Sequence, residues 1–305
     1  MISGQERNTD ASRVSANRVL AGAHRGPTAP RIALGSQLRR LREAGNYTTV
    51  QAAEAIRATP SKISRLERGR SSARQRDVAD LLTLYGVTGE AEREELLALA
   101  RGTSTRGWWQ QYSDVMPRWL ELYVGLEKAA SVIRGYEVQF VHGLLQTEDY
   151  ARAVILISNA HGSADEIDRR VSLRMRRQLL LTQPASPQLW AVLDEAALCR
   201  PPGDPAVMRG QLEHLLHVTD LPNVTVQILP FRAGPHAASG GPFTILRFPE
   251  PDLPDVIYLE QLNSALYLDQ GDEVTDYLTV MDNLCVQASD PTASKDILRA
   301  LLKEI

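Results

Sequence analysis

Four polar or basic side chains follow Pro60 at a spacing that places them on the outward surface of a short helix: Ser61, Lys62, Ser64 and Arg65. Arginine and lysine donate hydrogen bonds to O6 and N7 of guanine, and a serine hydroxyl contacts either a base or a phosphate. The first turns of a helix in the major groove are the part that reaches base edges. The sequence therefore predicts base contacts from these four residues.

Basic residues continue this positive face along the chain: Arg68, Arg70, Arg74 and Arg76. Contacts from such side chains to phosphates position a protein on a duplex without specifying its sequence. We therefore expect these arginines to add affinity rather than selectivity.

The charge of the chain is divided unevenly along its length. Residues 1–76 contain 15 Lys and Arg against 5 Asp and Glu, a net charge of +10, while residues 77–305 contain 19 against 32, a net charge of −13. A basic segment joined to an acidic body is expected where one end of a protein meets a polyanion and the other does not. A solubilising tail on a solvated surface is the alternative explanation.

Two short helices must hold the basic residues in place. Thr48 and Gln51 have the spacing of a capping box, which predicts a helix over 49–56. Thr59 is a good N-cap for a second helix, Pro60–Arg68, whose first residue is a proline. The three-residue turn between them gives the layout of a helix-turn-helix. Amphipathic patterns over 34–45, 75–85 and 89–100 complete five helices.

Two stretches of this segment resemble the Xre type of helix-turn-helix, also known as the Cro or phage-repressor type: Leu34–Arg42 and Thr59–Arg70. The resemblance implies an all-α, five-helix domain that binds operator DNA. It also implies that Arg42 forms a structural ion pair with Glu67, which clamps the first helix to the third. One departure is the turn, which has arginine and alanine at 57–58 where the family often has glycine.

The resemblance also implies that the start of the second helix grips a phosphate. The matching positions are Thr49 and Gln51. With the residues named above, the predicted DNA-binding set is Thr49, Gln51, Ser61, Lys62, Ser64, Arg65, Arg68 and Arg70.

The rest of the chain has the patterns of an α+β domain, so we expect a multidomain protein. Helical periodicity covers 120–132, 147–159, 164–181 and 205–217, and strand-like runs cover 189–194, 224–229, 243–248 and 256–260. The expected parts are a disordered basic arm (1–32), the helix-turn-helix domain (33–102), an α+β effector or interaction domain (103–290) and an amphipathic C-terminal helix (291–305). The last helix either packs on its own domain or binds a partner.

This second part is similar to the C-terminal domain of actinobacterial, antitoxin-like Xre regulators. The similarity is carried by Trp108–Trp109, Tyr123–Glu127, Ile133–Tyr136, Gly143–Thr147, Tyr150, Arg174, Arg177 and Tyr258–Glu260. One departure is His142, where the family has proline. Many such regulators have a small partner protein encoded nearby, so the resemblance implies a regulatory role and names no ligand.

Five aromatic residues are candidates for lining a ligand or partner pocket: Trp108, Trp109, Tyr112, Tyr123 and Tyr136. Small-molecule pockets are mostly apolar and aromatic with few polar groups. Packing in a core or at a domain interface is the alternative, because aromatic side chains dominate cores as well.

Several classes of chemistry find no support in the sequence. The two cysteines lie far apart, and His214 and His217 have no evident third ligand, so we expect neither a metal nor a cofactor. The motifs GxSxG, HExxH, GxGxxG and the P-loop are missing, and the loop 234–241, with His236, lacks a placed base and orienting acid, so we expect no enzyme. Apolar runs are too short to span a membrane and no signal peptide is evident, so we expect a cytoplasmic protein.

These features favour a sequence-specific transcriptional regulator that binds double-stranded DNA as a homodimer, because one recognition helix covers only a few base pairs. A small partner protein or a small-molecule effector would modulate it through the C-terminal domain. One alternative is an antitoxin-like protein that chiefly sequesters a small partner protein and autoregulates its own operon. A second is an enzyme acting on a small molecule, which needs a cleft with converging titratable groups.

Overall fold

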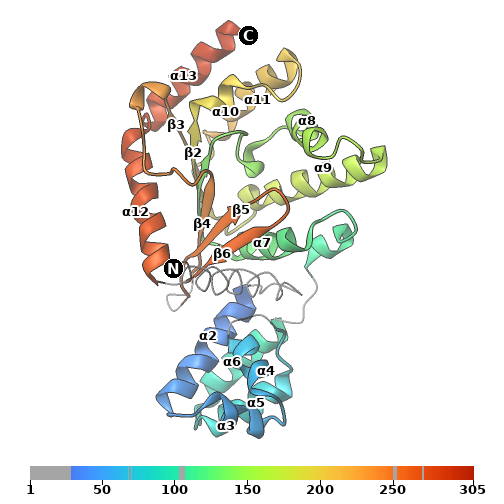
Figure 1. Ribbon diagram of the computed structural model, residues 1–305, viewed down its shortest axis with the longest axis vertical. Coiled ribbons are helices and arrows are strands. Elements are labelled where there is room, and N and C mark those ends of the chain that lie inside the picture. The colour runs from blue at the N-terminus through green and yellow to red at the C-terminus, as the bar shows by residue number, and fades with distance from the viewer. Residues whose placement is uncertain (1–28, 68, 70, 103–106, 250–252, 270) are drawn as a thin grey trace, which may run out of the picture.

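The computed structural model describes residues 29–67, 69, 71–102, 107–249, 253–269 and 271–305. Arg68 and Arg70, two of the predicted phosphate contacts, lie outside the described residues, as do residues 1–28 of the expected arm and 103–106 of the segment between the two parts. Figure 1 shows the N-terminal helices gathered in one group and a sheet with its own helices in another.

Five helices form the N-terminal group in the described part of the chain, as the sequence predicts. They are α2 (Ala29–Ala44), α3 (Thr49–Ala55), α4 (Pro60–Glu67), α5 (Gln75–Leu84) and α6 (Glu90–Gly102). Their apolar sides meet in one hydrophobic core, in which Leu38, Ile63 and Leu81 are fully buried. The helical spacing of such residues, which gives each helix one apolar side, is why local periodicity finds these elements.

Helix α2 begins earlier than expected. The sequence predicts a disordered arm up to residue 32, but the helix starts at Ala29. Proline is tolerated in the first turn, where its missing N–H has no intrahelical partner to lose, so Pro30 opens the helix rather than preventing it.

The C-terminal part is built on a six-stranded mixed sheet in the order β3-β2-β1-β4-β5-β6. Its strands are β1 (Val132–Glu137), β2 (Gln188–Asp194), β3 (Val224–Leu229), β4 (Phe243–Arg247), β5 (Val256–Glu260) and β6 (Ala265–Leu268). Strands β1, β2 and β3 are parallel, while β4, β5 and β6 are each antiparallel to the strand before them in the order. The fold is therefore α+β, with β1 where the parallel and antiparallel halves meet.

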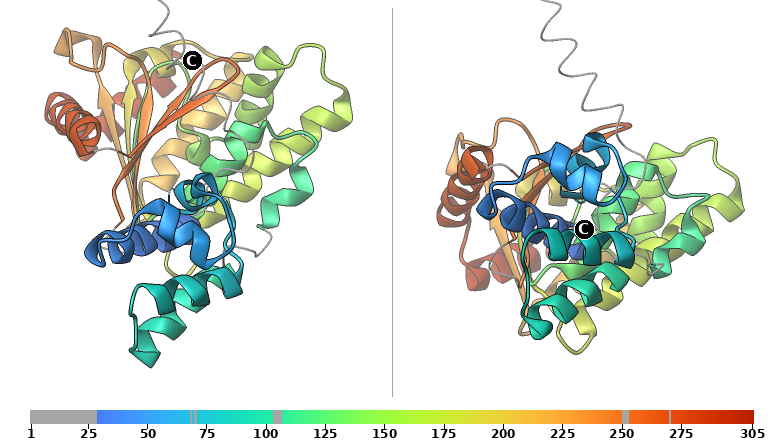
Figure 2. Two further views of the ribbon diagram at one scale, coloured as in Figure 1. Left: turned by 60° about the horizontal axis from the view of Figure 1, so that its bottom comes forward. Right: turned by 90° about the horizontal axis from the view of Figure 1, so that it is seen from below.

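Helices cover both faces of this sheet (Figure 2). The helices are α7 (Arg118–Ala129), α8 (Glu148–Ser158), α9 (Ala164–Gln178), α10 (Glu195–Cys199), α11 (Pro205–Val218), α12 (Gly271–Gln287) and α13 (Pro291–Glu304), with 3₁₀ turns η1 (Trp108–Tyr112), η2 (Gly143–Leu145), η3 (Leu179–Thr182) and η4 (Phe231–Ala233). The larger core joins one face of the sheet to α7, α8 and α11 and includes Ile133, Leu189 and Leu212. The smaller core joins the other face to α12 and includes Ile257 and Met281.

The last helix, α13, packs on its own domain. Leu298 is fully buried in the larger core, and the helix contacts α11 and β3. The Ser294 hydroxyl accepts a hydrogen bond of 2.9 Å from the backbone N–H of Ile228, and Ser289 N–H donates to the Ile228 carbonyl. These bonds occupy backbone groups on the outer edge of β3, which would otherwise be open to pairing with another chain.

Four helices and strands of the sheet domain are not expected from the sequence: β1, β6, α10 and α12. The helical pattern over 120–132 ends at Ala129, and β1 follows because pairing with both β2 and β4 holds that segment extended. Strand β6 has four residues, too few for a clear alternation. Helix α12 did have a local signal, since Val274, Leu278 and Met281 recur at helical spacing.

Candidate functional site

Helix α4 presents the residues predicted to contact bases. Ile63 and Leu66 are buried in the helical core, while Ser61 and Arg65 are exposed and Ser64 is half-buried. Arg65 Nη1 lies 3.4 Å from the Ser61 hydroxyl, one turn earlier on the same face. The exposed face of α4 therefore carries a guanidinium and a hydroxyl side by side, a donor arrangement that suits a guanine edge.

Lys62 has a partner that the sequence did not indicate. Its ammonium lies 2.5 Å from Oδ2 of Asp77 on α5, and the Asp77 side chain is only 4% exposed. A buried carboxylate needs such a partner, since removing it would leave an uncompensated charge. In this structure Lys62 ties α4 to α5 instead of extending freely toward a base edge.

The start of α3 is fixed by the predicted capping box. The Thr48 hydroxyl accepts from Gln51 N–H at 3.2 Å, and Gln51 Oε1 accepts from Thr48 N–H at 2.8 Å. Thr49, the first residue of the helix, is half-buried and Gln51 is exposed. The amide Nε2 of Gln51 and the Thr49 hydroxyl are the groups at this helix start that can donate to a phosphate.

The turn of the helix-turn-helix closes without glycine. Arg57 adopts φ +51°, its N–H donates to the Glu54 carbonyl, and Ala58 N–H donates to the Ala53 carbonyl. This bonding pattern is a Schellman motif, in which the left-handed position is usually glycine. The same pattern ends α5, where that position is Gly86 at φ +76°.

Replacing Arg57 with glycine is expected to stabilise the helical domain by about 1 kcal/mol, because glycine adopts a left-handed φ without the Cβ clash. Gly86→Ala is the matched control, since it puts a Cβ at the equivalent position in open space and should cost about as much. Thermal unfolding followed by circular dichroism should place the midpoint of Arg57→Gly above, and that of Gly86→Ala below, the parent value. The same sign for both variants would contradict this account.

Arg42 and Glu67 form a bidentate ion pair between α2 and α4. Arg42 Nε lies 2.6 Å from Glu67 Oε1, and Nη2 lies 3.1 Å from Oε2. Both side chains are largely buried, and Arg42 Nη1 also donates to the carbonyl of Tyr47. The pair holds the end of α4 against the first helix, and the Glu67 carboxylate raises the pKa of Arg42.

The five aromatic residues predicted to line one pocket lie in three different environments. Trp109 and Tyr112 are buried in a small cluster with α7 and α9, Tyr123 lies in the larger core, and Tyr136 lies in the core on the opposite face of the sheet. Among the five, only Trp108 lines the pocket described next. The structure therefore does not bring the five side chains together, and it places four of them in hydrophobic cores, the alternative given above.

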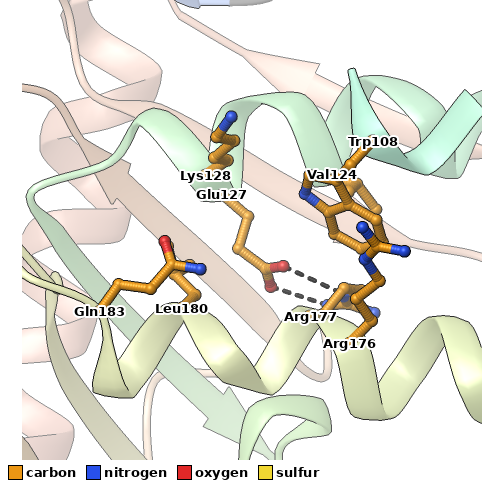
Figure 3. Close-up of a pocket in the computed structure, with 8 residues that line it drawn as sticks. All are labelled: Trp108, Val124, Glu127, Lys128, Arg176, Arg177, Leu180 and Gln183. Carbon is orange, nitrogen blue, oxygen red and sulfur yellow. Dashed lines mark hydrogen bonds and ion pairs between the residues drawn. The ribbon is translucent and has the colours of Figure 1, made fainter.

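That pocket lies beside α7 and α9 over a buried ion pair (Figure 3). Arg177 Nε and Nη2 donate to the two carboxylate oxygens of Glu127 at 2.9 and 2.7 Å, and both side chains are less than 10% exposed. Burial alone would lower the pKa of Arg177, but the Glu127 carboxylate outweighs it and the pKa is raised. The cavity has a volume of about 130 Å³ and is lined by Trp108, Val124, Glu127, Lys128, Arg176, Arg177, Leu180 and Gln183.

Three of the residues that carry the family resemblance of the C-terminal part meet around the loop before α8: Gln146, Tyr150 and Arg174. Arg174 donates to Gln146 Oε1 at 2.9 Å, and Gln146 Nε2 donates to the Val141 carbonyl at 2.7 Å. Tyr150 OH accepts from Val141 N–H at 3.2 Å. These bonds fasten the loop to α9, so much of this motif set is structural.

His142 occupies the position where proline was expected. Its backbone φ of −50° is one that proline also adopts, and its ring Nδ1 accepts from Leu144 N–H as the N-cap of η2. Burial, with Arg177 and Arg174 nearby, lowers the pKa of His142 from 6.5 to about 4. The folded protein therefore holds this histidine neutral.

Because the pKa of His142 is lower in the folded state, its neutral form contributes stability above pH 6.5 that is lost as the pH falls toward 4. We expect a loss of up to about 1.4 kcal/mol per pH unit from this group. His142→Asn retains an acceptor for the cap and cannot titrate, so its unfolding free energy should fall less steeply. Urea unfolding at pH 7, 6 and 5 measures both slopes, and parallel slopes would contradict the assignment.

The ends of β1 and β2 carry a second polar group of residues. Tyr136 OH donates to Asp194 Oδ2 at 3.2 Å and lies 3.0 Å from Nε2 of His236. Nδ1 of His236 is buried and has no hydrogen-bond partner among the residues that the structure describes. The sequence placed no acid or base near the loop 234–241, but the fold places Tyr136 and Asp194 beside it. Asp194 and His236 lie 58 and 100 positions after Tyr136 in the sequence, so no local pattern indicates that these three side chains meet.

Comparison with known families matches two parts of the chain. Residues 120–300 match the model described as "Domain of unknown function (DUF5753)", which covers more than half of the chain. The chain belongs to the DUF5753 family. In this DUF5753 protein, residues 33–96 match a model described as "Helix-turn-helix domain". A helix-turn-helix domain indicates DNA binding and transcription regulation.

The comparison with curated proteins gave no match to the DUF5753 protein, and neither did the comparison with solved structures. Within the described residues, no helix is both long and apolar enough to cross a membrane. The same residues contain no group of three or more His, Cys, Asp or Glu side chains placed to hold a metal ion.

Proposed function

We propose that this protein is a sequence-specific transcriptional regulator that places α4 in the major groove of its operator. The main support for this proposal is the exposed face of α4, which presents Arg65 and Ser61. The opposite face of the helix is held in the core by Ile63 and Leu66. The net charge of +10 over residues 1–76 supports a DNA contact at this end. Arg65 reads a base, while Thr49 and Gln51 contact a phosphate.

The proposal assigns Lys62 a positioning role rather than base contact. Its ion pair with the buried Asp77 couples α4 to α5 and sets the angle at which α4 leaves the domain. Ser64 remains a candidate base contact on the same helix. Arg68 and Arg70 remain candidate phosphate contacts on the strength of the sequence.

Two copies are needed to read a full operator. A single recognition helix covers a few base pairs, and a two-fold dimer places two of them about 34 Å apart on successive turns of the duplex. The protein acts as a homodimer in the cytoplasm, and its C-terminal domain transmits the state of a ligand or a small partner protein. The proposal includes no catalytic activity.

The decisive experiment is fluorescence anisotropy of the full-length protein with its own promoter region and with a scrambled duplex, each over a salt series. Arg65→Ala is expected to weaken promoter binding by about tenfold to a hundredfold and to weaken scrambled binding much less. Arg299→Ala removes the same charge from an exposed position on α13 and should leave both affinities unchanged.

Retention of full promoter preference by Arg65→Ala would refute the placement of α4. Equal binding of the parent protein to both duplexes would instead favour the antitoxin-like alternative, in which DNA binding depends on a partner. Co-purification of the neighbouring gene product with the parent protein would then test that alternative directly.

A further inference from the structure

The pocket of Figure 3 carries two basic side chains that are not neutralised by any acidic side chain of the described residues. Lys128 and Arg176 are exposed at the pocket and form no ion pair with the described part of the chain, whereas Arg177 is matched by Glu127. The pocket therefore has a net positive charge, although residues 77–305 have a net charge of −13. A local field of this sign attracts an anion.

Part of the pocket wall is apolar and aromatic, beside the charged residues and Gln183. Trp108, Val124 and Leu180 supply this part. The guanidinium carbon of Arg176 lies 5.0 Å from the centre of the Trp108 ring, so a cation–π contact holds this charge beside the aromatic wall. An apolar group against this part of the wall and an anionic group next to Arg176 would both meet complementary surfaces.

We propose that this pocket binds a small carboxylic acid with an apolar tail about the size of one aromatic ring. The carboxylate pairs with Arg176, the tail lies against Trp108 and Val124, and Lys128 adds positive charge at the rim of the pocket. The volume of about 130 Å³ sets the size of the ligand, since a cavity of about 150 Å³ accepts a benzene molecule. The buried pair Glu127–Arg177 forms a fixed floor that need not rearrange.

The position of the pocket gives the ligand a route to the DNA-binding part, and this step rests on the proposed function. Trp108 begins η1 directly after the segment that follows α6. Helix α7, which supplies Val124, Glu127 and Lys128, contacts α2. Occupancy of the pocket therefore changes promoter affinity, and promoter binding changes ligand affinity by the same factor.

The first test measures binding of phenylacetate to the full-length protein by isothermal titration calorimetry, with phenylacetamide as a neutral probe of the same shape. A ligand of this size filling the pocket is expected to bind with a Kd on the order of 1 mM. The amide should bind about tenfold more weakly, because it carries no charge to pair with the Arg176 guanidinium. Equal binding of the two probes, or no binding of phenylacetate, would overturn the proposal.

A pair of variants on α9 locates the site. Arg176→Gln is expected to weaken phenylacetate binding about tenfold and to leave phenylacetamide binding unchanged. Arg170→Gln makes the same charge change on the same helix, at a residue that pairs with Glu166 and does not line the pocket. An equal loss in both variants would show a general charge effect and would also overturn the proposal.

The second test repeats the promoter titration with saturating phenylacetate. A change in promoter affinity of at least about threefold is expected, together with the reciprocal change in phenylacetate affinity. Specific promoter binding without phenylacetate binding would remove the ligand site alone. Phenylacetate binding without specific promoter binding would leave the site in place and refute the proposed function, and unchanged affinity in both directions would refute the coupling.

Discussion

Replacing Glu127 with glutamine is expected to destabilise the sheet domain by about 3–5 kcal/mol. The change leaves the guanidinium of Arg177 buried without a counter-charge, and arginine cannot discharge itself by losing a proton. Arg177→Met should cost less, because the Glu127 carboxylate that remains can take up a proton. The double variant Glu127→Leu/Arg177→Met should recover most of the loss, since it removes both charges together.

Urea unfolding followed by tryptophan fluorescence measures this ranking. All four tryptophans, Trp108, Trp109, Trp119 and Trp190, belong to the C-terminal part, so their emission reports its unfolding separately from the helical domain. A double variant as unstable as Glu127→Gln would show that packing, rather than the unpaired charge, sets the cost.

Gly35→Ala is expected to destabilise the helix-turn-helix domain by about 3 kcal/mol and to abolish promoter binding with it. A Cβ at this position would lie 2.5 Å from the carbonyl oxygen of Leu66 and 2.6 Å from that of Glu67. Both obstacles are backbone atoms at the end of α4, so relief requires α2 and α4 to separate. That separation would also pull apart the ion pair between Arg42 and Glu67.

Circular dichroism should show an early helical transition in Gly35→Ala, while tryptophan fluorescence of the sheet domain stays at the parent midpoint. Gly210→Ala is the control, because Gly210 lies within α11 and an added Cβ meets nothing within 4 Å. Alanine is the better helix former, so this control should gain about 0.5–1 kcal/mol. A parent-like melting curve for Gly35→Ala would contradict the close approach of the two helices.

The N-terminal fold was predictable because its signals are local. The capping box of Thr48 and Gln51, the start of α4 at Pro60 and the apolar spacing of Leu34 and Leu38 each involve residues within one or two turns. Strands β3 and β5 were found to the residue, since both are short apolar runs bounded by turn residues. Helix α12 has the same kind of local signal in the spacing of Val274, Leu278 and Met281.

The contacts at the candidate sites were harder to predict because they join residues on different helices and strands. Lys62 has the sequence context of a base contact, yet it pairs with Asp77. Asp77 lies on the next helix and is brought close to Lys62 only by packing. Trp108 and Tyr136 are both aromatic residues directly after an Arg-Gly pair, yet one lines the pocket and the other packs on the far face of the sheet. Only the path of the chain decides such outcomes.

By itself, the sequence determined that a basic helical DNA-binding unit precedes an acidic α+β unit, because charge, caps and periodicity are properties of neighbouring residues. The tertiary structure alone decided which charges are neutralised, and so which remain for a ligand. Glu127 pairs with Arg177, 50 positions away in the sequence. Lys128, next to Glu127, and Arg176, next to Arg177, line the pocket. Burial and pairing depend on which helix faces meet, and that is set by packing over the sheet rather than by local sequence.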